Sequence, residues 1–77
     1  MTGVRDEAVR LVAKALGIQL SEVDETTALG ITPQWDSLAH MRLILAVEKK
    51  LNKKLGPEEI VGLTGIQDVI DLLMTGI

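Results

Sequence analysis

The chain has 77 residues and a formal net charge of −3, which suits one domain over residues 1–77 and disfavours a nucleic-acid binder, because such proteins usually present a basic face. It has no cysteine and one histidine, His40, so it offers neither a disulfide framework nor a multi-histidine metal site, and we expect no metal. A chain this short buries only about 60% of the surface of its unfolded form, which leaves little room for an enclosed active site.

The first predicted element is a helix that runs from Thr2, its expected N-cap, to about Leu16. Gly17 is expected to end it, because glycine readily adopts the left-handed conformation at helix ends. The inner face is marked by apolar residues at helical spacing: Val4, Ala8, Leu11, Val12 and Ala15.

Residues 17–36 form a long connection that contains several turn or loop formers: Ser21, Thr26, Thr27, Gly30, Thr32 and Pro33. Connections of this length in a compact domain are often functional. Its acidic residues Glu22, Asp24 and Glu25 lack the length and glycine placement of a calcium loop. We expect its apolar residues to fasten the connection to the helices: Ile18, Leu20, Val23, Leu29 and Ile31.

The second helix is the clearest element, with Asp36 as N-cap, Ser37 as first helical residue, and its end at Leu51 or Asn52. Its apolar residues form two stripes at about 100° per residue. One stripe is the better core candidate: Leu43, Ile44, Val47 and Leu51. The other, here called the outer stripe, lies nearly opposite and consists of Leu38, Met41 and Leu45.

A small bundle can bury only one of these stripes fully, and Arg42 and Lys49 lie within the outer one. Burying one such apolar side chain is worth about 1.5–3 kcal/mol, so three left in water indicate a docking surface. The alternative is that the outer stripe packs under the connection 17–36.

Two further helices complete the chain. Gly56-Pro57 begins a short third helix that Gly62 stops. The run from Thr64 to Gln67 predicts a capping box for a fourth helix. The inner face of this helix consists of Ile66, Val69, Ile70 and Leu73. Since no segment shows a strand pattern, the sequence predicts an all-α fold, a small four-helix bundle of three longer helices and one short helix.

Ser37 is one of two serines, and unlike Ser21 it opens a helix. Free N–H groups and the positive end of the helix dipole would favour a phosphate on its hydroxyl by about 0.3–1 kcal/mol. Asp36 can accept from the N–H of Leu38 or Ala39, which holds the turn, although its charge would repel a phosphate. The alternative is that Asp36 and Ser37 merely cap a helix.

Ser37 and His40 lie three residues apart, which raises the possibility of a nucleophile–base pair. The two side chains project at well-separated angles, and no third group is evident to orient the imidazole. His40 lies in line with the core stripe, so we expect it to be a partly buried packing residue. We expect Trp35 to pack in the core as well, and the alternative is that it forms a lid over an entrance.

The segment from Trp35 to Glu48, in which Asp36-Ser37-Leu38 opens an amphipathic helix that later carries Leu and Glu, resembles the acyl and peptidyl carrier protein family. The resemblance continues through the preceding connection, the Pro57–Ile60 segment and the helix after Thr64. It implies a bundle of the acyl carrier protein type. It also implies a 4′-phosphopantetheine arm, derived from coenzyme A, on Ser37, where a phosphopantetheinyl transferase recognises the motif that includes Asp36.

The resemblance further implies a non-enzymatic carrier that holds an acyl or aminoacyl thioester on the arm. It would present this cargo to the biosynthetic enzymes that load and process it. The residues that match the family's partner-binding positions are Leu38, Met41, Arg42 and Leu45. We expect a cytoplasmic monomer that binds no membrane, since the sequence lacks a signal peptide and any apolar stretch of about 20 residues. Its beginning at Met1 favours a free-standing carrier.

The second helix departs from the acidic helix of fatty acid synthesis carriers. Its only acid is Glu48, whereas several cations lie in or after it: Arg42, Lys49, Lys50, Lys53 and Lys54. Basic partner patches should bind this face poorly. We therefore expect a specialised pathway: polyketide, nonribosomal peptide or saccharide modification. The alternative function is an unmodified protein-interaction module that uses the outer stripe. The alternative for the cations is that they form only a solvated face with no role in the choice of partner.

Overall fold

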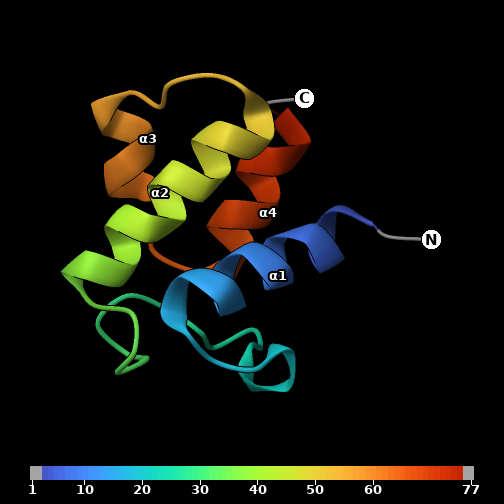
Figure 1. Ribbon diagram of the computed structural model, residues 1–77, viewed down its shortest axis with the longest axis vertical. Coiled ribbons are helices and arrows are strands. Elements are labelled where there is room, and N and C mark those ends of the chain that lie inside the picture. Colours follow the sequence, from blue (N-terminus) through green and yellow to red (C-terminus); the bar gives the residue numbers. More distant parts are fainter. Residues whose placement is uncertain (1–2, 76–77) are drawn as a thin grey trace.

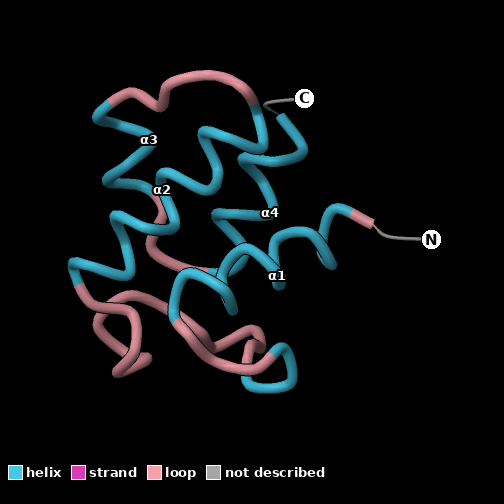
Figure 2. The backbone as a smooth tube through the Cα atoms, viewed as in Figure 1, coloured by secondary structure: helices cyan, strands magenta, loops and turns pink. Residues whose placement is uncertain are grey.

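A computed structural model of the protein describes residues 3–75 (Figures 1 and 2). Its elements in chain order are α1 (Val4–Leu16), the single 3-10 turn η1 (Leu20–Glu22), α2 (Ser37–Leu51), α3 (Pro57–Gly62) and α4 (Ile66–Thr75). Residues 3–75 contain no strand, and the only β-type pairing there is an isolated bridge between Ala28 and Gly65. The predicted all-α fold with three longer helices and one short helix is confirmed.

The core lies where α1 packs against both α2 and α4, while the short α3 flanks α2 (Figure 1). The predicted inner face of α4 is confirmed, because Ile66, Val69, Ile70 and Leu73 are all buried. The largest fully buried side chains come from every part of the chain: Val12, Trp35, Leu43, Val47, Leu63, Val69 and Leu73. None of the helices in the described range is long and apolar enough to cross a membrane.

The ends of the first two helices follow local rules that the sequence shows. Gly17 ends α1 in the left-handed conformation at φ 70°, and the N–H of Ile18 reaches back to the carbonyl of Ala13 at 3.0 Å. Asn52 ends α2 in the same conformation at φ 55°. The predicted cap Thr2 lies outside the described residues, and Gly3 occupies the N-cap position.

The capping box predicted for α4 is wrong by one residue. Thr64 pairs with Asp68, whose Oδ2 accepts from the Thr64 backbone N–H at 3.3 Å and from its Oγ1 at 3.0 Å. Gln67 instead donates to Asp71. The reason is register: α4 begins at Ile66, so the third helical position, which reaches back past the helix start, is that of Asp68.

The connection 17–36 is not fastened as the sequence predicted. Leu20, Leu29 and Ile31 are exposed, and only Ile18 and Val23 pack partly against the core. The exposed residues Leu20, Leu29 and Ile31 belong to segments that are held mainly by backbone hydrogen bonds. Their side chains are therefore free to point outward.

Polar groups hold the connection in place. Thr27 is only 3% exposed, and its carbonyl accepts from the N–H of Ile66 at 3.2 Å. The N–H of Leu29 donates to the carbonyl of Thr64 at 2.8 Å. Together these bonds tie the middle of the connection to the start of α4. The segment that leads from there to α2 therefore begins at a position held by hydrogen bonds.

The turn at Asp24 yields a prediction for its acid titration. The Oγ1 and N–H of Thr26 both donate to Asp24 Oδ1, at 2.6 and 2.8 Å, and hold the pKa of this carboxyl below its ordinary 3.8. These bonds therefore stabilise the fold above the ordinary pKa, and the contribution is lost as pH falls through the lowered value. We expect Thr26→Ala to raise the pKa of Asp24 part of the way to 3.8.

The check is a carbon-detected NMR titration of the Asp24 carboxyl. Thr75→Ala, which removes a hydroxyl bonded to the far end of α4, is the matched control and should leave this titration unchanged. An Asp24 pKa that is the same in Thr26→Ala and in the unaltered protein would contradict the assigned cause.

Candidate functional site

Ser37 is the first residue of α2, and its side chain is exposed. Within residues 3–75 its hydroxyl forms no hydrogen bond to the protein. The helix places it where the chain turns from the connection into α2, on the outside of the bundle. A reacting group from another molecule can therefore reach the Ser37 oxygen without any opening of the core.

Asp36 fixes the turn at Ser37. It has an extended backbone at φ −100°, and its Oδ1 accepts from the N–H of Ala39 at 2.9 Å while its carbonyl accepts from His40. The predicted cap is confirmed, with Ala39 as the partner. The N–H groups of Ser37 and Leu38 have no partner within residues 3–75, as is usual for the first turn of a helix. Two free donors at the positive end of α2 suit a phosphate on Ser37, which is the fit that a phosphopantetheine arm requires.

A hydrogen-bonded link between Trp35, His40 and Ile60, here called the brace, lies directly beside this turn, and the sequence did not reveal it. Trp35 is 2% exposed, and its indole Nε1 donates to His40 Nδ1 at 3.1 Å. His40 Nε2 lies 2.9 Å from the carbonyl oxygen of Ile60 in α3. Because a carbonyl only accepts, Nε2 carries the proton, and both ring nitrogens are engaged. His40 thus links the connection, α2 and α3, and it has no free nitrogen for Ser37.

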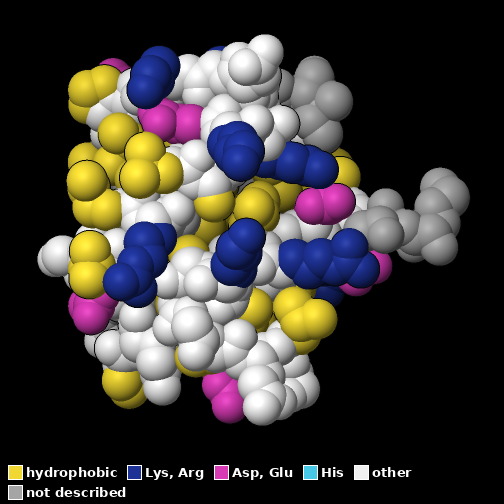
Figure 3. Space-filling model, viewed as in Figure 1, with side chains coloured by type: hydrophobic (Ala, Val, Ile, Leu, Met, Phe, Trp, Pro, Cys, Tyr) yellow, Lys and Arg dark blue, Asp and Glu magenta, His cyan; other side chains and the backbone are white. Residues whose placement is uncertain are grey.

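The outer stripe is exposed along α2. The residues Leu38, Met41 and Leu45 are 60%, 61% and 59% exposed, so the connection does not cover them. Figure 3 shows hydrophobic side chains gathered over the side of the molecule formed by α2 and α3. The predicted exposure is confirmed, and the alternative in which the connection buries the stripe is wrong.

The model of a family described as a phosphopantetheine attachment site matches residues 6–73 of the 77. The chain belongs to this family. Members of the family hold 4′-phosphopantetheine covalently, so the chain is a phosphopantetheine-carrying carrier protein, as its resemblance implied. Such a carrier interacts with a phosphopantetheinyl transferase and with biosynthetic enzymes.

The charge on α2 of this carrier protein is positive where it meets solvent. Arg42 and Lys49 are exposed, whereas the side chain of Glu48 is only 14% accessible. Glu48 Oε2 accepts from the N–H of Leu55 at 2.9 Å and so holds the link between α2 and α3. The one acid of the helix therefore has a structural partner and does not offset the exposed cations.

The remaining polar residues singled out from the sequence do not gather at Ser37. Glu22, Asp24 and Glu25 are exposed in the connection, and residues 3–75 contain no cluster of His, Cys, Asp or Glu that could hold a metal ion. What the structure brings together in the carrier protein is the Ser37 hydroxyl, the Asp36 cap, the outer stripe beside them on α2, and the brace formed by Trp35 and His40.

Proposed function

We propose that Ser37 is the attachment residue and that the protein carries an acyl or aminoacyl intermediate as a thioester on a 4′-phosphopantetheine arm. The observation that carries the proposal is the exposed hydroxyl of Ser37, which has no hydrogen-bond partner among residues 3–75, at the capped start of α2 inside the matched range of the family. The arm's thiol would hold the cargo, and tethering would raise the cargo's effective concentration at each enzyme.

In the proposed attachment step the Ser37 oxygen attacks the β-phosphorus of coenzyme A. The new O–P bond forms as the pyrophosphate bond breaks, and adenosine 3′,5′-bisphosphate leaves. A base on the transferase takes the hydroxyl proton, because both nitrogens of His40 are engaged by Trp35 and Ile60. The carrier's own part is to hold the oxygen exposed, with the N–H groups of Ser37 and Leu38 beside the phosphate.

We further propose that the protein is a non-enzymatic cytoplasmic monomer, folded as one domain over its length, that serves a specialised pathway. The exposed Arg42 and Lys49 support the pathway assignment, because a partner with a basic patch would be repelled by this face. Polyketide, nonribosomal peptide or saccharide-modifying enzymes with neutral or acidic contact surfaces are the expected partners.

The test is mass spectrometry of the unaltered protein after incubation with coenzyme A, Mg²⁺ and a promiscuous phosphopantetheinyl transferase. We expect an intact mass increased by one phosphopantetheine, and fragmentation should place the addition on the peptide that contains Ser37. Omission of the transferase is the control. An unchanged mass, or an addition on a peptide without Ser37, would remove the proposal and favour the unmodified interaction module.

The outer stripe leads to a prediction for the transferase reaction. We expect Met41→Asp to lower kcat/KM for modification about tenfold, because it places a charge in a desolvated contact, while the loss of stability stays small at this exposed site. Met74→Asp is the matched control, since Met74 in α4 is 63% exposed and lies away from the stripe. Equal kinetics of the two variants, measured by the rate of mass conversion, would contradict docking on the outer stripe.

A further inference from the structure

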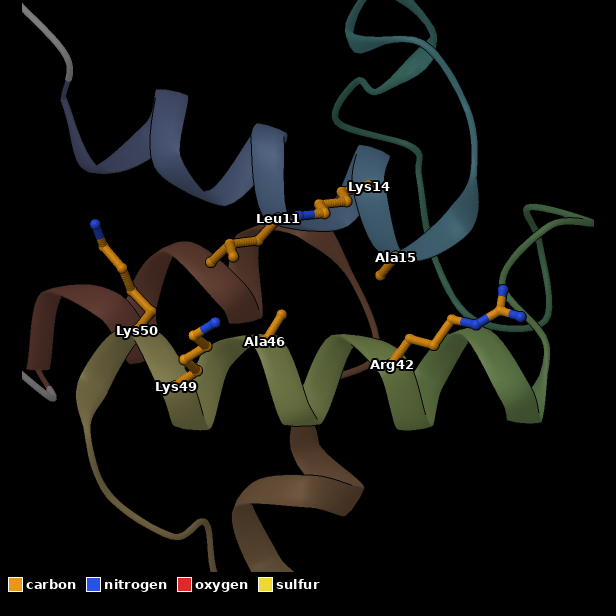
Figure 4. A pocket seen from close by; sticks show the side chains of 7 residues that line it. All are labelled: Leu11, Lys14, Ala15, Arg42, Ala46, Lys49 and Lys50. Atoms are coloured by element: carbon orange, nitrogen blue, oxygen red, sulfur yellow. The ribbon is translucent and has the colours of Figure 1, made fainter.

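A groove of about 500 Å³ lies between α1 and α2, and its lining includes none of Leu38, Met41 and Leu45. It is here called the α1–α2 groove. Its floor is apolar and consists of Leu11, Ala15 and Ala46. Its rim consists of four cations: Lys14, Arg42, Lys49 and Lys50. Figure 4 shows the floor residues of the two helices facing one another. The two alanines keep the floor open to close approach by another chain.

The groove concentrates positive charge on an acidic protein. Four of the chain's eight Lys and Arg residues line it, and none of its lining residues is acidic. Lys50 pairs with Glu7 at 3.3 Å, whereas Lys14, Arg42 and Lys49 have no ion-pair partner among residues 3–75. Figure 3 shows Lys and Arg side chains gathered over α1 and α2 with hydrophobic surface between them. The surface is therefore complementary to an anionic partner that also carries apolar side chains.

The spacing of the cations indicates the shape of that partner. Arg42 lies at the end of the groove nearer the start of α2, and Lys49 lies at the other end (Figure 4). Seven residues separate them, so their backbone positions are about two helical turns or roughly 10 Å apart along the axis, and the Arg42 side chain extends further toward the start of α2 (Figure 4). A partner helix with carboxylates two turns apart and leucines between them would place its charges at the cations of both groove ends. Its leucines would lie on the apolar floor. A small anionic ligand would neutralise one end only, and an open groove would not enclose it as small-molecule sites usually do.

We infer that the α1–α2 groove binds an acidic amphipathic helix of a partner protein. The apolar side of the partner helix packs on Leu11, Ala15 and Ala46, and its carboxylates lie against the unpaired cations. This contact does not use Ser37, Leu38, Met41 or Leu45, but it shares Arg42 and Lys49 with the charged face described under the proposed function and to that extent rests on it. The carrier can thus be held through this groove while an enzyme approaches the serine end of α2.

The test uses the unmodified 77-residue chain and a fluorescein-labelled synthetic helix with leucines on one face and glutamates two turns apart beside them. We expect saturable binding by fluorescence anisotropy that weakens as salt is raised, since salt screens exposed charges. NMR shift changes should centre on Leu11, Ala15 and Ala46. A peptide with lysine at each glutamate position should not bind.

The decisive variant is the double substitution Arg42→Glu/Lys49→Glu, for which we expect a loss of affinity of about tenfold or more. Lys53→Glu/Lys54→Glu is the matched control, with the same change in charge outside the groove, and should change affinity by less than about twofold. Its two ion pairs, at 3.9 and 4.0 Å, are at the surface and contribute little. Far-UV circular dichroism checks the fold of both variants.

If Arg42→Glu/Lys49→Glu fails to fold, Arg42→Gln/Lys49→Gln replaces it, with an expected loss of affinity for the peptide of about threefold. Equal losses in the groove variant and its control would overturn the inference, because they would show attraction by net charge alone. No binding of the glutamate peptide up to about 1 mM would also overturn it. Displacement of the peptide by sodium dodecanoate, with NMR shift changes at the same groove residues, would overturn it as well. That result would show that the groove binds a small amphiphilic molecule. Modification of Ser37 is measured independently, so either idea can fail alone.

Discussion

Ser37→Ala protein is expected to gain no phosphopantetheine under conditions that modify the unaltered chain completely. The reason is that the substitution removes the one oxygen that the proposal makes the acceptor. Ser21→Ala is the matched control, because Ser21 is the only other serine and is also exposed, in η1 instead of at the start of α2. Intact mass spectrometry of the three proteins, treated in parallel, makes the measurement.

This loss would not come from unfolding. The Ser37 side chain is exposed, and alanine is well tolerated at the first position of a helix, so the free energy of unfolding should change by no more than about 0.5 kcal/mol. Asp36 still caps α2 through the N–H of Ala39. A phosphopantetheine adduct on Ser37→Ala, or its disappearance in Ser21→Ala, would show that the attachment site lies elsewhere.

Trp35→Ala is expected to lower the free energy of unfolding by about 3–5 kcal/mol, as does truncation of a large buried aromatic residue in other cores. A domain of this size has only about 5 kcal/mol in total, so this variant should be largely unfolded at 37 °C. The effect combines a cavity in the core with the loss of the indole donor to His40. Urea unfolding followed by far-UV circular dichroism measures it.

Trp35→Phe separates the two contributions. It keeps most of the apolar ring but leaves His40 Nδ1 without its donor, so we expect a loss of about 1–3 kcal/mol. Met74→Ala, an exposed truncation, should stay within about 0.5 kcal/mol of the unaltered protein. If Trp35→Ala costs less than about 1 kcal/mol, Trp35 does not brace the start of α2.

The parts of the fold that could be predicted from sequence are those that local chemistry determines. Gly17 and Asn52 end their helices, and Asp36 begins α2, because each makes its hydrogen bonds within a few residues. The outer stripe could be predicted because a helix has a fixed period and a small bundle can bury only one of its faces. The candidate serine followed from its place at the start of such a helix and from the family resemblance.

The parts that could not be predicted depend on residues far apart in the chain. The bond between His40 and Ile60 spans twenty residues, and no sequence pattern marks it. The connection 17–36 carries apolar residues, yet the backbone pairing of Thr27 with Ile66 holds it while Leu20 and Ile31 face solvent. The α1–α2 groove likewise depends on how two helices cross. Three of its four cations, Arg42, Lys49 and Lys50, look like part of a solvated charge run when read along the chain, and Lys14 comes from another helix.

The rigid start of α2 has a consequence for how a cargo is delivered. Ser37 and Met41 belong to one unbroken helix, so the proposed anchoring oxygen and the middle of the outer stripe stay about 6 Å apart along the helix axis. An enzyme that binds the outer stripe would therefore position Ser37, the proposed attachment residue of the arm, without contacting the arm itself. Under the proposed function, the same contact would serve cargoes of different size, because only the tethered end would have to adapt to each catalytic pocket.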